Sequence, residues 1–173
     1  KTNHVYISDP KASFFSPDTL SCKNSLVRFI NTSQGPSIRS IWDFGDGATG
    51  IVNNTTHRYF ANGVYDIKLT ITDGYGCKDS VTLPTYINID EPKALFTMSD
   101  SVGTCPPLIV RFTNQSTYFK YFDWNFGDGT GSTLSNPEHY YNYPGTYYAR
   151  LIVISPGGCT DTLTKKIVVE GPT

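Results

Sequence analysis

The stretch that decides the fold is Trp42-Asp43-Phe44-Gly45-Asp46-Gly47, which recurs 82 residues later as Trp124-Asn125-Phe126-Gly127-Asp128-Gly129. The same offset relates further identical pairs: His57 and His139, Tyr59 and Tyr141, Gly63 and Gly145, Tyr65 and Tyr147, Leu69 and Leu151, and Cys77 and Cys159. Self-similarity at a fixed period is typical of repeated structural units. The 173 residues are therefore expected to form two copies of one unit.

Proline-containing stretches mark the edges of the copies. Residues 86–94 join the two copies and closely resemble residues 5–12, so residues 1–10 are interpreted as the tail of a preceding repeat and its linker. The first domain is expected at residues 11–91 and the second at residues 92–173. Residues 167–172 again combine an apolar run with a proline, which predicts a further module beyond this piece of the chain.

Alternation of apolar and polar residues predicts strands in each copy. In residues 63–72 the odd positions from Tyr65 to Ile71 are apolar and the even positions from Asp66 to Thr72 are polar, which indicates a half-buried strand. Residues 38–44 alternate likewise, so Trp42 is expected to point into a core just before a Gly-Asp-Gly turn. Further strands are predicted near residues 12–15, 26–31, 49–53 and 80–89. The sequence thus predicts an all-β chain of two tandem immunoglobulin-like sandwiches with about seven strands each.

Charge and hydropathy exclude several classes of function. The net charge is −1, and nucleic-acid binders need a clustered basic face, so no nucleic-acid partner is expected. The longest apolar runs are too short to cross a bilayer, so no membrane insertion is expected in this segment. The sequence contains no strained nucleophile turn, metal motif or phosphate-binding loop, so the chain is not expected to be an enzyme.

The hexapeptide, followed by His57-x-Tyr59 and Gly63-x-Tyr65, resembles the PKD (polycystic kidney disease) repeat. Both copies carry the pattern, with Asn125 in the place of the usual aspartate. The residues assigned to the structural motif are Trp42, Asp46, Gly47, His57 and Tyr65 in the first copy and Trp124, Asp128, Gly129, His139 and Tyr147 in the second. The histidines are interpreted as hydrogen-bonded structural residues, with a ligand role as the alternative.

Each copy also holds one pair of cysteines, with Gly-Cys-x-Asp at residues 76–79 and 158–161. This variety resembles secreted proteins of Bacteroidetes, which include gliding-associated adhesins and type IX secretion cargo. From their repeated placement we expect two disulfides, Cys22–Cys77 and Cys105–Cys159, and hence an oxidising, extracellular location. A zinc site is the alternative, but the spacing contains no Cys-x-x-Cys pair.

Calcium is the one cofactor that the sequence leaves open, and none is required. Asp43, Asp46 and Asp128 offer the oxygen ligands that calcium prefers, but formation of the Gly-Asp-Gly turn explains them equally well. Asp9, Asp90 and Glu91 lie near the linkers, where some PKD repeats bind calcium. These three residues are too few to define a site.

The two copies differ most at positions that the alternation places outside the core. Ser37, Arg39, Asp66, Lys68, Thr70 and Thr72 of the first copy become Phe119, Tyr121, Tyr148, Arg150, Ile152 and Ile154 in the second. The second copy is therefore expected to expose an apolar patch, and such patches usually contact a partner. The patch does not distinguish a protein from a polysaccharide ligand. Burial under a neighbouring module, or a shift in strand register, would explain it as well.

These observations predict a non-catalytic extracellular interaction and spacer module of a larger multi-repeat surface or secreted protein. Its expected partners are a protein or polysaccharide surface, to which it would adhere, and neighbouring repeats of the same chain. The alternative is an accessory substrate-binding segment of a secreted enzyme that degrades polysaccharide or protein.

Overall fold

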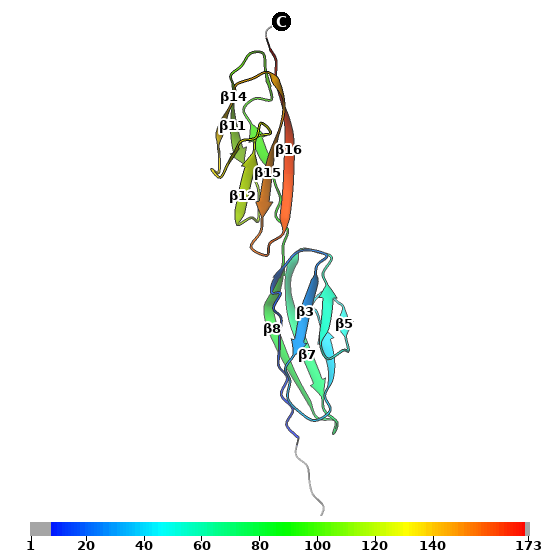
Figure 1. Ribbon diagram of the computed structural model, residues 1–173. Helices are drawn as coiled ribbons and strands as arrows, with labels where there is room; N and C mark the ends of the chain where they lie inside the picture. Colours follow the sequence, from blue (N-terminus) through cyan, green and yellow to red (C-terminus); the bar gives the residue numbers. More distant parts are fainter. Residues whose placement is uncertain (1–7, 172–173) are drawn as a thin grey trace, which may run out of the picture. The chain divides into compact units, whose positions relative to one another are not determined.

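The computed structural model describes residues 8–171, which form strands and turns in two compact units that divide between Asp90 and Glu91 (Figure 1). The strands of the first unit are β1 (Phe14–Phe15), β2 (Leu20–Ser21), β3 (Leu26–Asn31), β4 (Arg39–Asp43), β5 (Thr49–Gly50), β6 (Thr55–Arg58), β7 (Gly63–Thr72) and β8 (Lys78–Ile89). Those of the second unit are β9 (Phe96–Met98), β10 (Val102–Gly103), β11 (Leu108–Asn114), β12 (Tyr121–Asn125), β13 (Gly131–Ser132), β14 (Glu138–Tyr141), β15 (Gly145–Ile154) and β16 (Thr160–Val169). No helix able to cross a membrane occurs in this described part of the chain. Most of the expected tail of a preceding repeat, residues 1–7, lies outside it.

Each unit is a sandwich of one three-stranded and one five-stranded sheet. In the first unit the sheet orders are β1-β3-β6 and β2-β8-β7-β4-β5, and in the second they are β9-β11-β14 and β10-β16-β15-β12-β13. The expected all-β fold with tandem immunoglobulin-like units is confirmed. The described residues show eight strands in each unit rather than about seven, because short strands such as β2 contain too few residues for alternation to reveal them.

The core of each sandwich is built around its single tryptophan. Trp42 and Trp124 are almost completely buried, and each packs edge-on against a phenylalanine of the opposite sheet, Phe14 or Phe96, at centroid distances of 5.1 and 5.0 Å. In β7, Ile67, Leu69 and Ile71 are fully buried and the residues between them are not. The alternation read from the sequence is thus confirmed within the long strands.

The predicted disulfides Cys22–Cys77 and Cys105–Cys159 are wrong. Cys77 and Cys105 are free thiols, so neither predicted pair is bonded. Cys22 follows β2, which pairs with the end of β8, whereas Cys77 precedes the start of β8. The 12 residues of β8 span about 40 Å, while the Cα atoms of a disulfide lie within about 7 Å of each other. The length of the last strand therefore rules out a bridge within one unit.

Candidate functional site

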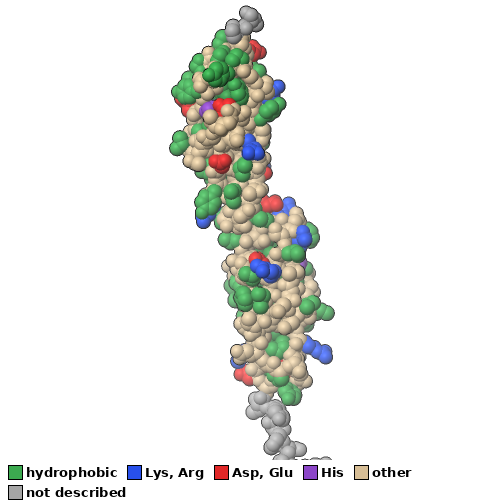
Figure 2. Space-filling model, in the orientation of Figure 1, with side chains coloured by type: hydrophobic (Ala, Val, Ile, Leu, Met, Phe, Trp, Pro, Cys, Tyr) green, Lys and Arg blue, Asp and Glu red, His purple; other side chains and the backbone are tan. Residues whose placement is uncertain are grey.

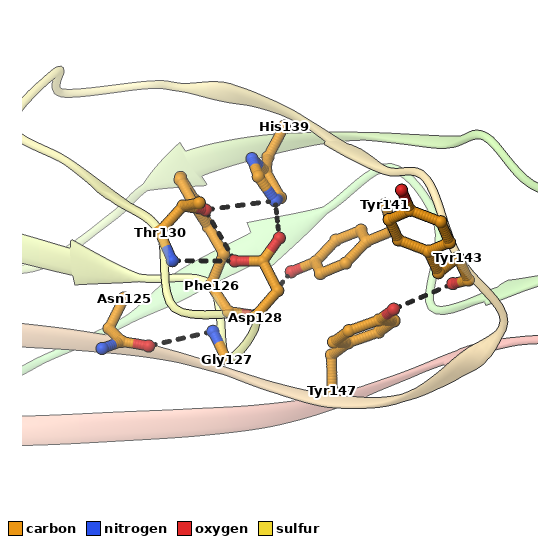
Figure 3. A network of polar contacts seen from close by, with 9 residues as sticks. All are labelled: Asn125, Phe126, Gly127, Asp128, Thr130, His139, Tyr141, Tyr143 and Tyr147. Carbon is orange, nitrogen blue, oxygen red and sulfur yellow. Dashed lines mark hydrogen bonds and ion pairs between the residues drawn. The ribbon is translucent and has the colours of Figure 1, made fainter.

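The repeated hexapeptide forms a tight turn at the end of the tryptophan strand in both units. In the second unit the Gly127 N–H donates to Asn125 Oδ1 at 2.9 Å and the Thr130 N–H donates to Asp128 Oδ1 at 3.0 Å (Figure 3). Gly127 has a φ of +83°, and a Cβ there would lie 2.6 Å from the backbone nitrogen of Tyr148. The position therefore requires glycine, since a side chain would clash with the neighbouring strand.

A histidine ties this turn to the opposite sheet. His139, on β14, lies 2.7 Å from Asp128 Oδ2 through its Nε2 atom, and its ring stacks on Phe126 with a centroid distance of 4.1 Å (Figure 3). Tyr141 packs edge-on against the same imidazole, and its hydroxyl donates to the carbonyl oxygen of Phe126 at 2.9 Å. The network thus joins the two sheets through ring packing and directed hydrogen bonds.

The first unit repeats this network with the same geometry. His57 Nε2 lies 2.7 Å from Asp46 Oδ2 and its ring stacks on Phe44 at 4.2 Å. The Tyr59 hydroxyl donates to the Phe44 carbonyl at 3.0 Å, and the ring of Tyr65 lies against that of Tyr59. Because two units with different surfaces keep the same contacts, these contacts are part of the scaffold.

The electrostatics of the network match static hydrogen bonding. Burial alone would raise the pKa of Asp46, but hydrogen bonds from His57 and from the Ala48 N–H outweigh it, so the pKa is lowered. The pKa of Asp128 is lowered in the same way: burial opposes the shift, and Thr130 and His139 provide the hydrogen bonds. Burial raises the pKa of both Tyr59 and Tyr141, and the nearby carboxylates add to the effect. The carboxylates are thus held ionised and the phenols protonated.

The candidate calcium ligands are used by the turns themselves. Both carboxylate oxygens of Asp46 and of Asp128 accept hydrogen bonds, and Asp43 Oδ1 accepts the Gly45 N–H at 3.0 Å. Asp9 forms an ion pair with Lys11 at 3.0 Å. Within residues 8–171 no three His, Cys, Asp or Glu side chains lie together as a possible metal site. The geometry therefore assigns Asp43, Asp46 and Asp128 to turn formation.

Strand register places the predicted patch of the second unit on two neighbouring strands. On β12 and β15, Tyr121 lies opposite Ile154 and Asp123 lies opposite Ile152. Tyr121 and Tyr148 are each 58% exposed, and the two isoleucines are half-buried. We call the surface formed by Tyr121, Tyr148, Arg150, Ile152 and Ile154 the aromatic–aliphatic face.

Phe119 does not belong to this face, although the alternation placed it there. Its half-buried ring packs edge-on against Phe122 at 5.6 Å and contributes to the core. Phe119 precedes β12 in a loop, where Tyr118 has a φ of +57° and is itself 68% exposed. Alternation predicts the direction of a side chain only within an extended strand, and Phe119 lies in the loop before β12.

The equivalent face of the first unit is polar. Arg39 lies opposite Thr72, and Asp43 lies opposite Lys68, on β4 and β7. Among the β4 and β7 residues of this face, Ile41 and Val64 are the large apolar side chains that are exposed, at 55% and 56%. Figure 2 shows a surface that is mostly neutral and polar, with scattered charges rather than a single charged area.

The second unit also contains two buried polar atoms that lack a partner, which sequence reasoning missed. Trp42 Nε1 donates to the Val52 carbonyl at 2.8 Å, and Asn31 Nδ2 donates to Ser40 Oγ at 2.8 Å. Their counterparts, Trp124 Nε1 and Asn114 Nδ2, have no hydrogen-bond partner among residues 8–171. The detectable signal was the replacement of Ser40 by phenylalanine at the equivalent position of the second unit.

Comparison with known families identifies the repeated unit. The PKD domain model matches residues 8–89 and again residues 91–170, and the chain belongs to this family. A solved PKD1 domain of Vibrio anguillarum Epp is 29% identical and covers 48% of this chain and 98% of that domain, with a TM-score of 0.41. The match to the family model confirms the PKD resemblance predicted from the turn motif.

Curated relatives that contain similar segments are proteases. A microbial collagenase of Vibrio alginolyticus is 31% identical over 80 residues, which are 46% of this chain and 9% of the relative. Collagenase ColA of Clostridium perfringens is 30% identical over 118 residues, 65% of this chain and 10% of the relative. The metalloprotease PrtV of Vibrio cholerae is 40% identical over 63 residues, 36% of this chain and 7% of the relative. The chain thus spans about a tenth of these relatives, and these matches do not show the finer resemblance to gliding-associated proteins.

Proposed function

We propose that this chain is a non-catalytic module of a larger extracellular protein and binds a protein partner through the aromatic–aliphatic face of its second unit. The observation that carries the proposal is the difference between equivalent faces: Thr70 and Thr72 in the first unit correspond to Ile152 and Ile154 in the second. Two strongly exposed tyrosines flank the isoleucines. Tyrosine is enriched among residues that dominate interface energies, and burial of the apolar area would drive binding.

The composition of the face favours a protein over a polysaccharide. Tyr148 is six residues along β15 from Ile154, the partner of Tyr121, so the two tyrosines are separated by about 20 Å along the strand direction. The surface between them combines Ile152 and Ile154 with the charged side chains of Arg150 and Asp123, and this mixture of apolar and charged groups suits a protein interface.

The relatives favour an accessory segment of an extracellular enzyme as the setting of this module. Segments like this one occur in collagenases and in a metalloprotease, where a binding module would hold substrate near a catalytic domain. An adhesin is the second candidate, favoured by the polar face of the first unit, which suits a spacer. The remainder of the polypeptide decides between them: a catalytic domain supports the first, and a long series of PKD repeats supports the second.

Binding to immobilised fibrillar collagen and gelatin tests the proposal, with cellulose and chitin as polysaccharide probes. The double variant Tyr121→Ser/Ile152→Ser should bind the protein probes at least about tenfold more weakly, as expected for loss of more than about 1.4 kcal/mol. The matched control is Arg39→Ser/Thr70→Ser, which changes equivalent positions of the first unit and should bind like the unaltered chain. Equal affinity of both variants, or binding to the polysaccharides alone, would overturn the proposal.

A further inference from the structure

The positive side chains of the second unit are unevenly distributed. Residues 91–173 contain six Lys and Arg and seven Asp and Glu residues, so the unit as a whole is close to neutral. Arg111 Nε forms an ion pair with Glu138 Oε2 at 2.7 Å, and the Lys165 ammonium donates to a main-chain carbonyl at 2.7 Å. Three of the other four cations are exposed on or beside the aromatic–aliphatic face: Lys120, Arg150 and Lys166. Positive charge is therefore concentrated at the surface that we propose binds a partner.

The strand register places two of these cations around one exposed tyrosine. On β15 and β16, Lys166 lies directly opposite Tyr148, and Arg150 is two residues further along β15. Opposite residues of antiparallel strands have Cβ atoms about 5 Å apart, and diagonal neighbours are about 7–8 Å apart. The guanidinium, the ammonium and the phenol therefore project from one side of the sheet within reach of a single ligand group. At the other end of the face, the Lys120 ammonium lies 5.1 Å from the centre of the Tyr121 ring.

The equivalent cation of the first unit has carboxylates beside it. Lys68 lies opposite Asp43 across β7 and β4, and Asp66 is two residues away on β7. Opposite residues, and residues two apart on a strand, project from the same side of a sheet, so both carboxylates are neighbours of the Lys68 ammonium. Their negative charges offset the attraction of Lys68 for an anion from outside the unit.

Neither of these carboxylates is present around Arg150. Asn125 replaces Asp43 opposite the cation, and Tyr148 takes the second position. Asn125 Oδ1 still accepts the N–H of the glycine two residues on, at 2.9 Å, as Asp43 Oδ1 does at 3.0 Å. The turn requires the oxygen atom and does not require its charge. The asparagine thus keeps the turn and removes a negative charge from beside Arg150.

Arg150 and Lys166 form no ion pair with any carboxylate in residues 8–171. A guanidinium without a partner offers parallel N–H groups that match the two oxygens of an incoming carboxylate. We propose that the protein partner of the aromatic–aliphatic face is an acidic segment, of which one carboxylate binds between Arg150 and Lys166. This inference rests on the proposed function and specifies the chemistry of the partner.

The rest of the face favours an acidic polypeptide over a sulfated polysaccharide, which would also supply anions. Ile152 and Ile154 continue along β15 from Arg150 and project from the same side of the sheet. Apolar side chains on either side of the bound carboxylate would cover these isoleucines and remove them from water. Sulfated sugars supply anions but few apolar groups. An extended segment with acidic and apolar residues on one side matches both parts of the face.

Two synthetic peptides test this chemistry: three repeats of Glu-Ser-Leu-Ser and three repeats of Gln-Ser-Leu-Ser, with heparin as the sulfated polysaccharide probe. In low salt the unaltered chain should bind the Glu peptide at least about fivefold more tightly than the Gln peptide, because two cations contact its carboxylates. The preference should decrease in about 0.5 M NaCl, which screens exposed charges. Equal affinities for the two peptides, no binding to either, or binding to heparin alone would overturn the inference.

Variants at the cation locate the binding site of the acidic segment. Asn125→Asp restores the carboxylate of the first unit and keeps the turn hydrogen bond, so the preference for the Glu peptide should fall to about twofold or less. Arg150→Gln should have the same effect. The matched control, Lys68→Gln, changes the equivalent cation of the first unit and should leave the preference unaltered. An unchanged preference in Asn125→Asp and Arg150→Gln would contradict binding at this site.

These measurements separate the inference from the proposed function. The double variant Tyr121→Ser/Ile152→Ser tests the face itself with collagen and gelatin. If it weakens binding while Asn125→Asp and Arg150→Gln keep the peptide preference, the face binds protein without recognising an acidic segment, and only this inference fails. If the double variant binds collagen and gelatin like the unaltered chain, the proposed function fails and this inference fails with it.

Discussion

The two units share one scaffold and differ in what surrounds it. Their aspartate–histidine networks agree to within 0.1 Å in ring distance, at 4.2 and 4.1 Å. By contrast, Trp42 Nε1 has a hydrogen-bond acceptor and Trp124 Nε1 has none. A buried donor without a partner costs about 1–3 kcal/mol, so the second unit gives up stability that the first retains. The motif therefore maintains the fold while the other positions diverge.

The largest expected effect tests whether the scaffold is equally important in both units. Gly45→Ala and Gly127→Ala should each destabilise their own unit by about 3 kcal/mol or more, because the new Cβ meets backbone atoms at 2.5 and 2.6 Å. Gly47→Ala is the control: it has a φ of +90° but open space around it, so about 1 kcal/mol is expected. Urea unfolding measures the free energy of unfolding of each variant. If Gly45→Ala lowers it no more than Gly47→Ala does, the predicted steric clash at Gly45 is wrong.

The tryptophans test the difference between the units. Trp42→Phe removes volume and the hydrogen bond to Val52, whereas Trp124→Phe removes volume and an unpaired donor. Trp42→Phe should therefore cost about 1–3 kcal/mol more than Trp124→Phe. Native-state hydrogen exchange of the amides in β7 and β15 reports the stability of each unit separately. Equal losses of stability in the two variants would mean that Trp124 Nε1 forms a hydrogen bond in solution.

Acid should weaken both networks to a similar extent. Because the pKa values of Asp46 and Asp128 are lowered by folding, the stabilisation they provide is complete above the ordinary aspartate pKa of about 3.9. This stabilisation is lost as the pH falls through the lowered pKa values of the two aspartates. Each hydrogen-bonded carboxylate should contribute about 1–2 kcal/mol. The free energy of unfolding is measured from pH 6 to pH 2. Asp46→Asn and Asp128→Asn should each make it decrease less at low pH, and an unchanged decrease would contradict an origin in these carboxylates.

The smallest stability effect is expected from moving the aromatic–aliphatic face to the first unit. Arg39→Tyr/Thr70→Ile/Thr72→Ile reproduces Tyr121, Ile152 and Ile154 at exposed or half-exposed positions, so stability should change by about 0.5 kcal/mol or less. Binding to the protein probe should instead rise from one site per chain to two. The stoichiometry from calorimetry checks this, and an unchanged stoichiometry would show that other residues define the face.

Much of the fold and part of the candidate site could be predicted from local pattern. The strict alternation in β7 and β15 identified the core residues because a strand turns successive side chains to opposite sides. The same rule placed Tyr121, Ile152 and Ile154 on one surface, which the register bears out. It misplaced Phe119, because a loop residue with positive φ, Tyr118, interrupts the extended backbone just before the strand.

The amino-acid sequence by itself determined the repeat, the PKD turn and the buried face of each long strand, since these depend on spacing along the chain. Only the tertiary structure decided that the two cysteines of one unit do not pair with each other. Cys22 and Cys77 are separated by a similar number of residues as Cys105 and Cys159, and this regularity suggested bridges within each unit. Parallel pairing of β2 with the end of β8 instead carries Cys22 to the end of the sandwich opposite Cys77. The distance between two thiols depends on strand pairing and strand length, which sequence separation does not report.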